Sequence, residues 1–184
     1  MKIALLVVPL ILILIIWVVV SYNGLIRINI AADEAFAQIE VQLKRRADLI
    51  PNLVETVKGY ATHEKSTLDA VISARAKATS ATGVADVAAA DGQLTTALRG
   101  LLAVAESYPD LKASANFLSL QEELSTTENK VAFARQFYND TIRSLNQAVK
   151  TFPSSLFAGM AKVTTRAFYE IENPTDRNVP NVKF

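Results

Sequence analysis

The chain has 184 residues, no cysteine, and nearly equal numbers of basic and acidic side chains, 19 and 18. Because Lys2 is the only charged residue before Arg27, the remainder holds 18 of each sign. This balance argues against nucleic acid as a partner, since phosphate binding needs a basic excess. The lack of cysteine excludes disulfides, thiolate metal sites and a cysteine nucleophile.

The first element of the chain is an apolar segment over residues 3–20. Its 18 consecutive apolar residues would form a helix about 27 Å long, close to the hydrocarbon thickness of a bilayer. A cleaved signal peptide is the alternative, but the run is longer than a usual h-region and no small-x-small cleavage pattern follows it. We therefore expect residues 1–24 to be a retained transmembrane anchor. The residues expected to define its place in the bilayer are Ile3, Trp17, Val20 and Tyr22.

The charges beside this segment bear on its orientation. The amino terminus and Lys2 stand on one side, while Arg27 and then Asp33 and Glu34 follow on the other. Because positive charge near a membrane helix favours the cytoplasmic side, this pattern favours an amino terminus inside the cell. The domain that follows is then expected outside the cytoplasm.

From residue 25 onward, the apolar residues repeat with the period of amphipathic helices. Breaks in the pattern predict helices near 25–58, 62–81, 84–107 and 116–151. Short connections favour antiparallel neighbours, so the predicted fold is all-α, an antiparallel four-helix bundle after the membrane helix. A short extra C-terminal helix is expected within residues 154–169. The expected domains are the anchor 1–24, the bundle 25–173 and an extended tail 174–184.

Three of the apolar stripes are interrupted by one polar residue each. These residues are Arg46, Asp91 and Thr127. Burying the guanidinium of Arg46 requires a carboxylate or several carbonyl acceptors. We expect Arg46 to form a structural ion pair, and a binding contact is the alternative role. The candidate partners are Glu106, Glu123 and Glu128.

The sequence offers little for catalysis. His63 begins a metalloprotease-like pattern, but it is the single histidine of the chain, and Thr67 occupies the place of the second zinc ligand. Glu122, Glu123 and Glu128 could suggest acid/base work, yet the Glu-x-x-His motif of di-iron bundles is absent. No phosphate-binding loop, nucleophile elbow or calcium loop occurs. We therefore expect no enzyme activity, no metal and no cofactor.

Several long segments resemble the LemA family. They are residues 42–54, 57–61, His63-Glu64, 102–113, Asn116-Phe117, 120–124, Glu128-Asn129, Ala134-Arg135, Tyr138-Asn139, Phe152-Pro153 and the closing 180–184. The resemblance covers nearly the whole chain after the anchor. It implies a bacterial membrane-anchored protein with an antiparallel helical-bundle domain and no catalytic activity. For the family, membrane organisation or remodelling and links to membrane proteolysis have been proposed.

Two functions from different classes follow from these features. The first is a non-enzymatic scaffold that self-associates on the lipid bilayer of the bacterial inner membrane. The second is an adaptor or regulator of a membrane protease. If the chain is a scaffold, we expect it to form a homo-oligomer. Because the anchor has no small-xxx-small pattern, the specific contacts between copies are expected to come from other segments. The extended tail is a candidate, through Val179, Val182 and Phe184, although it could instead dock on its own bundle.

Overall fold

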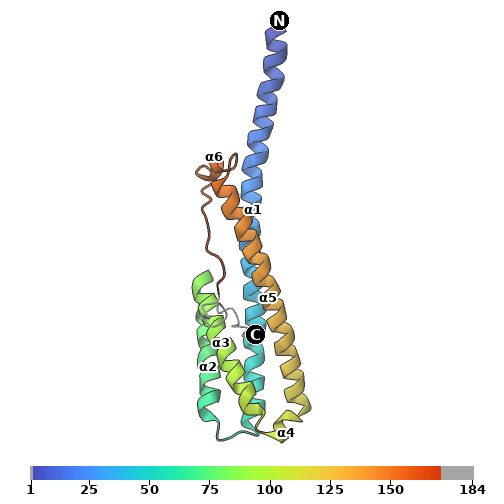
Figure 1. Cartoon of the computed structure of the whole chain (residues 1–184), viewed down its shortest axis with the longest axis vertical. Coiled ribbons are helices and arrows are strands. Elements are labelled where there is room, and N and C mark those ends of the chain that lie inside the picture. Colours follow the sequence, from blue (N-terminus) through green and yellow to red (C-terminus); the bar gives the residue numbers. More distant parts are fainter. Residues whose placement is uncertain (1, 171–184) are drawn as a thin grey trace, which may run out of the picture. The chain divides into compact units, whose positions relative to one another are not determined.

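The computed structural model describes the backbone of residues 2–170 and the side chains of residues 7–170. This part of the chain is helical and contains no strand, which confirms the predicted all-α class. The helices are α1 (Lys2–Lys58), α2 (Lys65–Ser80), α3 (Val84–Ala105), α4 (Pro109–Lys112), α5 (Ala115–Lys150) and α6 (Ser155–Ala158) (Figure 1).

The chain divides into two compact units. The first holds residues up to Ala37 together with Gln136–Phe168, and the second holds Gln38–Arg135 and resumes at Tyr169. Helices α1 and α5 contribute residues to both units, whereas α2, α3 and α4 belong to the second and α6 to the first.

Helix α1 is longer than the sequence pattern predicts, because the anchor and the first bundle helix form one helix. The polar residues 21–24 stay helical, and so does Pro51. Gly24 lies inside this helix, with open space where a Cβ would stand. A single glycine costs a helix only about 1 kcal/mol, and no proline interrupts residues 21–24. The composition of this stretch is therefore not enough to end the helix.

In the first unit, α1 and α5 pack through a small apolar core. Its buried members include Leu25, Ala32 and Ala35 of α1 and Tyr138, Ile142 and Leu145 of α5. The rings of Phe36 and Tyr138 lie 5.8 Å apart between centroids. Phe157 and Ala158 of α6 are also buried, so this short helix is anchored by its own apolar face.

The extra C-terminal helix is shorter than predicted. Helix α6 covers one turn, and residues 163–170 follow without helix. The Asn146 side chain donates to the carbonyl of Arg166 (2.9 Å) and accepts from its backbone N–H (2.8 Å). The Tyr138 hydroxyl donates to the carbonyl of Ala167 at 3.0 Å. Because side chains of α5 satisfy these backbone groups, the segment can remain extended beside α5.

The second unit is built around a larger apolar core to which five helices contribute. Its buried residues include Ile50, Leu53, Val57, Leu68, Val71, Leu94, Leu98, Leu101, Leu111, Phe117 and Leu124. Helix α4 is a single turn that the sequence pattern did not predict; Pro109 begins it and Leu111 enters the core. Arg75 of α2 donates from Nε to the carbonyl of Ala47 on α1 at 2.7 Å.

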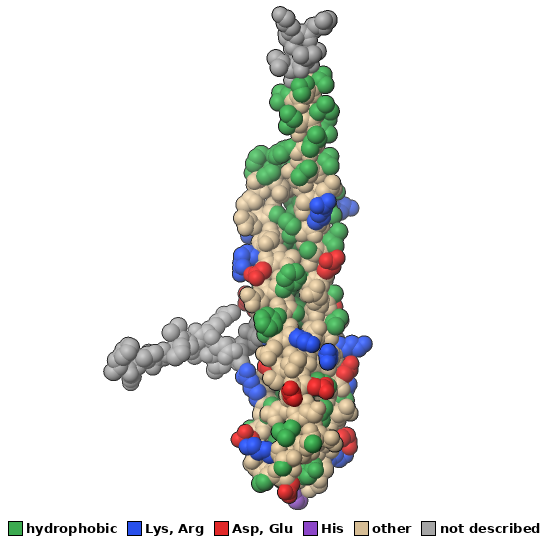
Figure 2. Space-filling view, turned by 90° about the vertical axis from the view of Figure 1, so that its right-hand side faces the viewer, with side chains coloured by type: hydrophobic (Ala, Val, Ile, Leu, Met, Phe, Trp, Pro, Cys, Tyr) green, Lys and Arg blue, Asp and Glu red, His purple; other side chains and the backbone are tan. Residues whose placement is uncertain are grey.

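The apolar end of α1 stands without cover over most of its circumference. From Val7 to Val20 nearly all of the large apolar side chains are exposed. On the face that Figure 2 shows, hydrophobic side chains cover this stretch, and no acidic or basic side chain is visible among them. Within the described residues, α1 is the one helix that is long and apolar enough to cross a membrane.

Candidate functional site

The main polar site of the second unit is a buried charge cluster at the side chains of Arg46, Asp91, Arg135 and Tyr169. Its centre is an ion pair between Arg46 of α1 and Asp91 of α3, with 3.0 Å between Nη1 and Oδ1. The same Nη1 donates to the hydroxyl of Thr95 at 2.9 Å. The side chains of Arg46 and Asp91 are only 3% and 2% exposed. This ion pair therefore joins α1 to α3 away from solvent.

The second carboxylate oxygen of Asp91 is also occupied. Tyr169 donates its hydroxyl to Oδ2 at 3.2 Å, and Nη1 of Arg135 on α5 lies 3.7 Å from the same oxygen. The guanidinium of Arg135 stands over the Tyr169 ring, with 5.7 Å between Cζ and the ring centroid. One buried carboxylate thus holds groups from α1, α5 and the segment after α6, which is the multiple pairing a buried charge requires.

The cluster is close to electrically neutral. Arg46 and Arg135 supply two positive charges, and Asp91 and Glu128 supply two negative ones, with 3.8 Å between Nη2 of Arg46 and Oε2 of Glu128. Two buried polar atoms of the described residues have no hydrogen-bond partner, Nε of Arg46 and Oε1 of Gln42. These atoms belong to residues one turn apart on α1, where polar groups without partners reduce the stabilisation that the cluster provides.

The environment keeps Tyr169 in its protonated form. Burial raises the pKa of its hydroxyl strongly, and the negative charge of Asp91 raises it further, while Arg135 opposes the shift. A protonated hydroxyl can donate a hydrogen bond, and the Tyr169 hydroxyl donates to the carboxylate of Asp91. The buried carboxylate of Asp91 is therefore surrounded by groups from Arg46, Arg135 and Tyr169.

Two of the four predicted ion-pair residues, Arg46 and Glu128, take part in the cluster. Arg46 is buried and paired, with Asp91 as its near partner and Glu128 at the edge of the cluster. Glu106 and Glu123 are exposed and form no ion pair with Arg46 in the described part of the chain, so these two candidate partners were wrong. Glu106 follows the end of α3, and Glu123 lies outside the buried face of α5. Asp91 was missed as a partner, although it interrupts an apolar stripe as Arg46 does.

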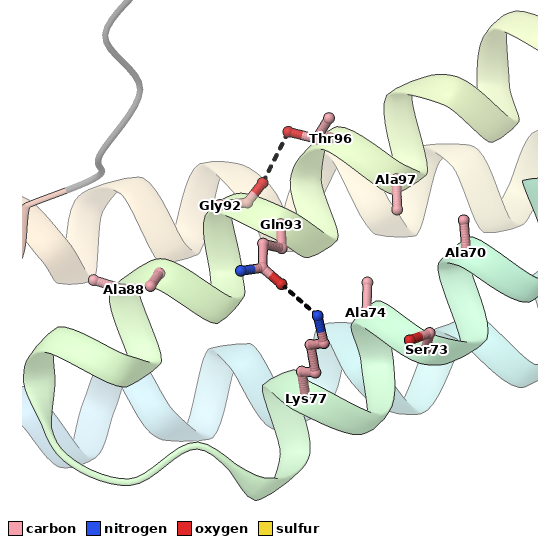
Figure 3. Close-up of a pocket in the computed structure, with 10 residues that line it drawn as sticks. Ala70, Ser73, Ala74, Lys77, Ala88, Gly92, Gln93, Thr96 and Ala97 are labelled. Carbon is pink, nitrogen blue, oxygen red and sulfur yellow. Dashed lines mark hydrogen bonds between the residues drawn. The ribbon is translucent and has the colours of Figure 1, made fainter.

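A groove of about 580 Å³ lies between α2 and α3 in the same unit. Small side chains line most of it: Ala70, Ser73, Ala74, Ala88, Ala89, Gly92, Thr96 and Ala97. Figure 3 shows Lys77 reaching across from α2, where its Nζ donates to Oε1 of Gln93 at 3.3 Å. Lys77 is the only charged residue of the lining, and it already has this partner. The groove offers shape but little chemistry for recognising a ligand.

No group of three metal-ligating side chains gathers within the part of the chain that the structure describes. His63 is exposed in the connection between α1 and α2. Near it, the hydroxyl of Tyr108 donates to Oε1 of Glu64 at 3.2 Å. Burial and the neighbouring Glu64 raise the pKa of this tyrosine, so the hydroxyl remains a donor.

The predicted anchor residues lie on α1 in the first unit. Trp17 and Val20 are exposed and Tyr22 is partly buried, while Ile3 lies in the helical stretch whose side chains are not described. The ring of Trp17 contacts two aromatic rings, one just after α5 and one in α6, at centroid distances of 5.9 Å to Phe152 and 6.3 Å to Phe157. The sequence pattern did not predict this contact. The predicted oligomer contacts Val179, Val182 and Phe184 lie outside the described residues.

Two comparisons with known proteins bear on these observations. The model of the LemA family matches residues 35–184. The curated Protein LemA of Metamycoplasma hominis is 28% identical over 131 residues, which is 71% of this chain. The chain spans 60% of the length of that relative.

Proposed function

The chain belongs to the LemA family, and we propose that this member is a non-enzymatic, single-pass scaffold that self-associates in a bacterial inner membrane. In this proposal, residues 1–24 are the membrane anchor and residues 25–173 form an antiparallel four-helix bundle on the extracytoplasmic side. Self-association then organises or remodels the membrane to which each copy is attached.

The anchor is supported by the apolar end of α1. Its exposed side chains would be costly in water, because transferring apolar surface to water costs about 25 cal/mol per Å². A bilayer removes that cost, and a helix satisfies its own backbone hydrogen bonds there. Confinement to a membrane also raises the effective concentration of the attached domains. Weak contacts between copies are then sufficient for assembly.

The buried charge cluster supports a structural role for the polar residues of the bundle. Its guanidinium and carboxylate groups contact one another and are largely closed to solvent. A substrate would have to displace these contacts to reach the charges. The cluster is therefore better suited to fixing which helices pack together than to chemistry.

The proposal of self-association depends mainly on two exposed aromatic side chains of α5. Phe133 is 72% exposed and Phe137 is 53% exposed. Residues four apart share one face of a helix, so the two rings present an apolar stripe that the chain's own described residues leave open. A second copy brought close by the anchor would cover this stripe and bury its apolar area.

Cysteine crosslinking in native membranes tests this proposal, because the chain has no cysteine of its own. Phe133→Cys should give a covalent dimer of the protein under mild oxidation. Arg99→Cys, at an exposed position on α3, is the matched control and should stay monomeric. Equal crosslinking at both positions, or none at Phe133→Cys, would contradict self-association through α5.

The adaptor function differs from the scaffold function in which proteins should be crosslinked to this chain. A crosslinked pull-down from native membranes should recover mainly copies of this chain. Recovery of a membrane protease in equal amount would favour the adaptor instead. Turnover by the purified protein that is lost in Arg46→Lys while the fold is retained would contradict the non-enzymatic assignment.

A further inference from the structure

Residues 152–160, a turn that follows α5 and includes the single-turn helix α6, expose three large apolar side chains. Phe152, Leu156 and Met160 are 73%, 62% and 74% exposed, more than most of the anchor itself. Single exposed apolar residues are ordinary on a protein surface, but a group of them within nine positions of the chain marks an interaction site. The exposed side chains are therefore candidates for contact with an apolar partner.

Aromatic contacts hold this turn against the anchor. Trp17 of α1 contacts the ring of Phe152 and the ring of Phe157, and all three residues belong to the first unit. Figure 1 shows α6 beside α1, at the end of α5. Phe157 is buried in this contact, so α6 is attached through one face while Leu156 and Met160 remain exposed.

The depth of Trp17 in the apolar segment fixes the depth of the turn. Trp17 lies four residues before Ser21, where the apolar run has ended. At 1.5 Å per residue this is about 6 Å inside the apolar boundary. Helices that lie in the membrane interface bury their apolar faces about 5–10 Å into the headgroup and acyl boundary. Side chains that pack at the level of Trp17 would lie within this layer.

Several backbone N–H groups of the turn have acceptors within it or close to it, which lowers the cost of entering lipid. Leu156 donates to the carbonyl of Pro153 at 3.2 Å, and Phe157 donates to that of Ser154 at 3.0 Å. Ala161 and Val163 donate to Phe157 and Ala158 at 2.9 and 3.0 Å. Inserting the apolar side chains would therefore leave few backbone N–H groups without an acceptor.

The charged residues that flank the apolar group are both basic. Residues 144–165 contain Lys150 and Lys162 and no acidic residue. Lys150 and Lys162 flank the apolar group in the sequence and are exposed. Lysines beside an inserted apolar group can extend their long side chains to lipid phosphates, and a basic residue near an anionic surface contributes attraction.

We propose that residues 152–160 form a second membrane contact, in which Phe152, Leu156 and Met160 insert into the interfacial layer of the leaflet that surrounds Trp17. Lys150 and Lys162 then contact anionic headgroups. This inference rests on the proposed function, because it requires residues 3–20 to cross the bilayer. The anchor and the turn together would attach each copy at two points and restrict its tilt.

Depth-dependent quenching in the full-length chain tests this contact. Single-cysteine variants are labelled with the fluorophore NBD and reconstituted into vesicles of phosphatidylethanolamine and phosphatidylglycerol, with or without brominated acyl chains. Leu156→Cys and Met160→Cys report the turn, and Ile13→Cys reports the anchor. Ile30→Cys is the matched control, because Ile30 is an exposed apolar residue of α1 that lies about 15 Å beyond Val20 along the helix.

The expected result is quenching at Leu156→Cys and Met160→Cys that is severalfold stronger than at Ile30→Cys. Quenching at Ile13→Cys alone would overturn the second contact and leave the anchor intact. A label in the turn that is shielded from water but not quenched by brominated chains would mean that protein covers the turn, which also overturns the proposal. Absence of quenching at Ile13→Cys would instead contradict the membrane-anchored function itself.

Discussion

Two arginines of this chain bind aspartates in opposite surroundings. In the second unit, the Arg46–Asp91 ion pair is 3% and 2% exposed. In the first unit, Arg166 pairs with Asp33 and donates to Oδ1 of Asn29 at 2.8 Å, but the Arg166 and Asp33 side chains are 31% and 64% exposed. The same kind of ion pair is therefore buried in the second unit and exposed to solvent in the first.

Solvent exposure determines how much each of these ion pairs contributes to stability. Around Arg166, water can solvate both charges whether or not they meet, so the pair adds little. Around Arg46, the loss of one partner leaves a charge buried without compensation. We therefore expect the two clusters to respond differently to substitution and to salt.

The largest effect is expected for Arg46→Ala. Removing this guanidinium leaves the buried Asp91 with Arg135 and Tyr169 as partners among the described residues, and breaking a buried pair typically costs about 3–5 kcal/mol. Urea unfolding of the full-length protein in one detergent, followed by circular dichroism, measures the free energy of unfolding. Arg45→Ala, at the exposed neighbouring position, is the control and should have little effect. Equal stability of the two variants would show that the cluster is not structural.

The sequence predicted the polar core positions better than it predicted their partners. Arg46, Asp91 and Thr127 interrupt apolar stripes, and these three are the buried polar or charged residues that the described side chains contain. A stripe records that a position faces inward, because its neighbours at helical spacing are apolar. It does not record which residue of another helix lies opposite, so the pairing with Asp91 was missed.

The end of α6 and the contact of α6 with Trp17 also could not be predicted from the local sequence pattern. Residues 154–169 have a helix-compatible apolar pattern, yet the segment after α6 is held by Asn146, which is 20 residues away from Arg166 in the chain. Local sequence preference is a weak guide where a distant side chain satisfies the backbone. The membrane contact proposed for Leu156 and Met160 likewise depends on α6 packing against α1, which no pattern within residues 154–169 encodes.

A second prediction concerns the tyrosine within the buried cluster. Tyr169→Phe removes the hydroxyl that donates to Asp91, and a hydrogen bond to a charged group contributes about 1.5–3 kcal/mol. Urea unfolding near neutral pH should show this loss. Tyr60→Phe, which alters an exposed ring, is the control and should leave stability nearly unchanged. A loss of equal size in both variants would contradict a specific role for Tyr169.

The pH dependence of this loss provides a third prediction. Burial raises the pKa of Tyr169 above its ordinary value of 10.0, so the folded state retains a proton that the unfolded state releases. The contribution of the hydroxyl is therefore complete below about pH 10 and decreases at higher pH. The stability difference between the unaltered chain and Tyr169→Phe should shrink as the pH rises from about 9 to about 11. A difference that grows over this range would give the wrong sign for a buried phenol.

The fourth prediction concerns the segment beside Arg166. Asn146→Ala removes both hydrogen bonds to the Arg166 backbone, and Asn146→Asp retains an acceptor for its N–H but loses the donor to its carbonyl. At about 0.5–1.5 kcal/mol for each bond, we expect a loss of about 1–3 kcal/mol for Asn146→Ala and about 0.5–1.5 kcal/mol for Asn146→Asp. Hydrogen exchange of the Arg166 amide should accelerate most in Asn146→Ala. Asn129→Ala, at an exposed position on α5, should leave that exchange rate unchanged.

The smallest effect is expected for Arg166→Met, which retains the apolar stem but removes the charge paired with Asp33. An exposed pair contributes about 0.2–1 kcal/mol, so this loss should lie well below that of Arg46→Ala. Raising the salt concentration from about 0.1 M to about 1 M shortens the Debye length from about 10 Å to about 3 Å. The loss caused by Arg166→Met should therefore diminish in high salt, whereas that caused by Arg46→Ala should persist because ions do not screen a buried pair. Arg143→Met is the matched control, since Arg143 forms a similarly exposed pair with Asp140 at 2.7 Å. A salt-independent loss at Arg166 as large as that at Arg46 would contradict the proposed effect of burial, because solvent exposure would then not distinguish the two clusters.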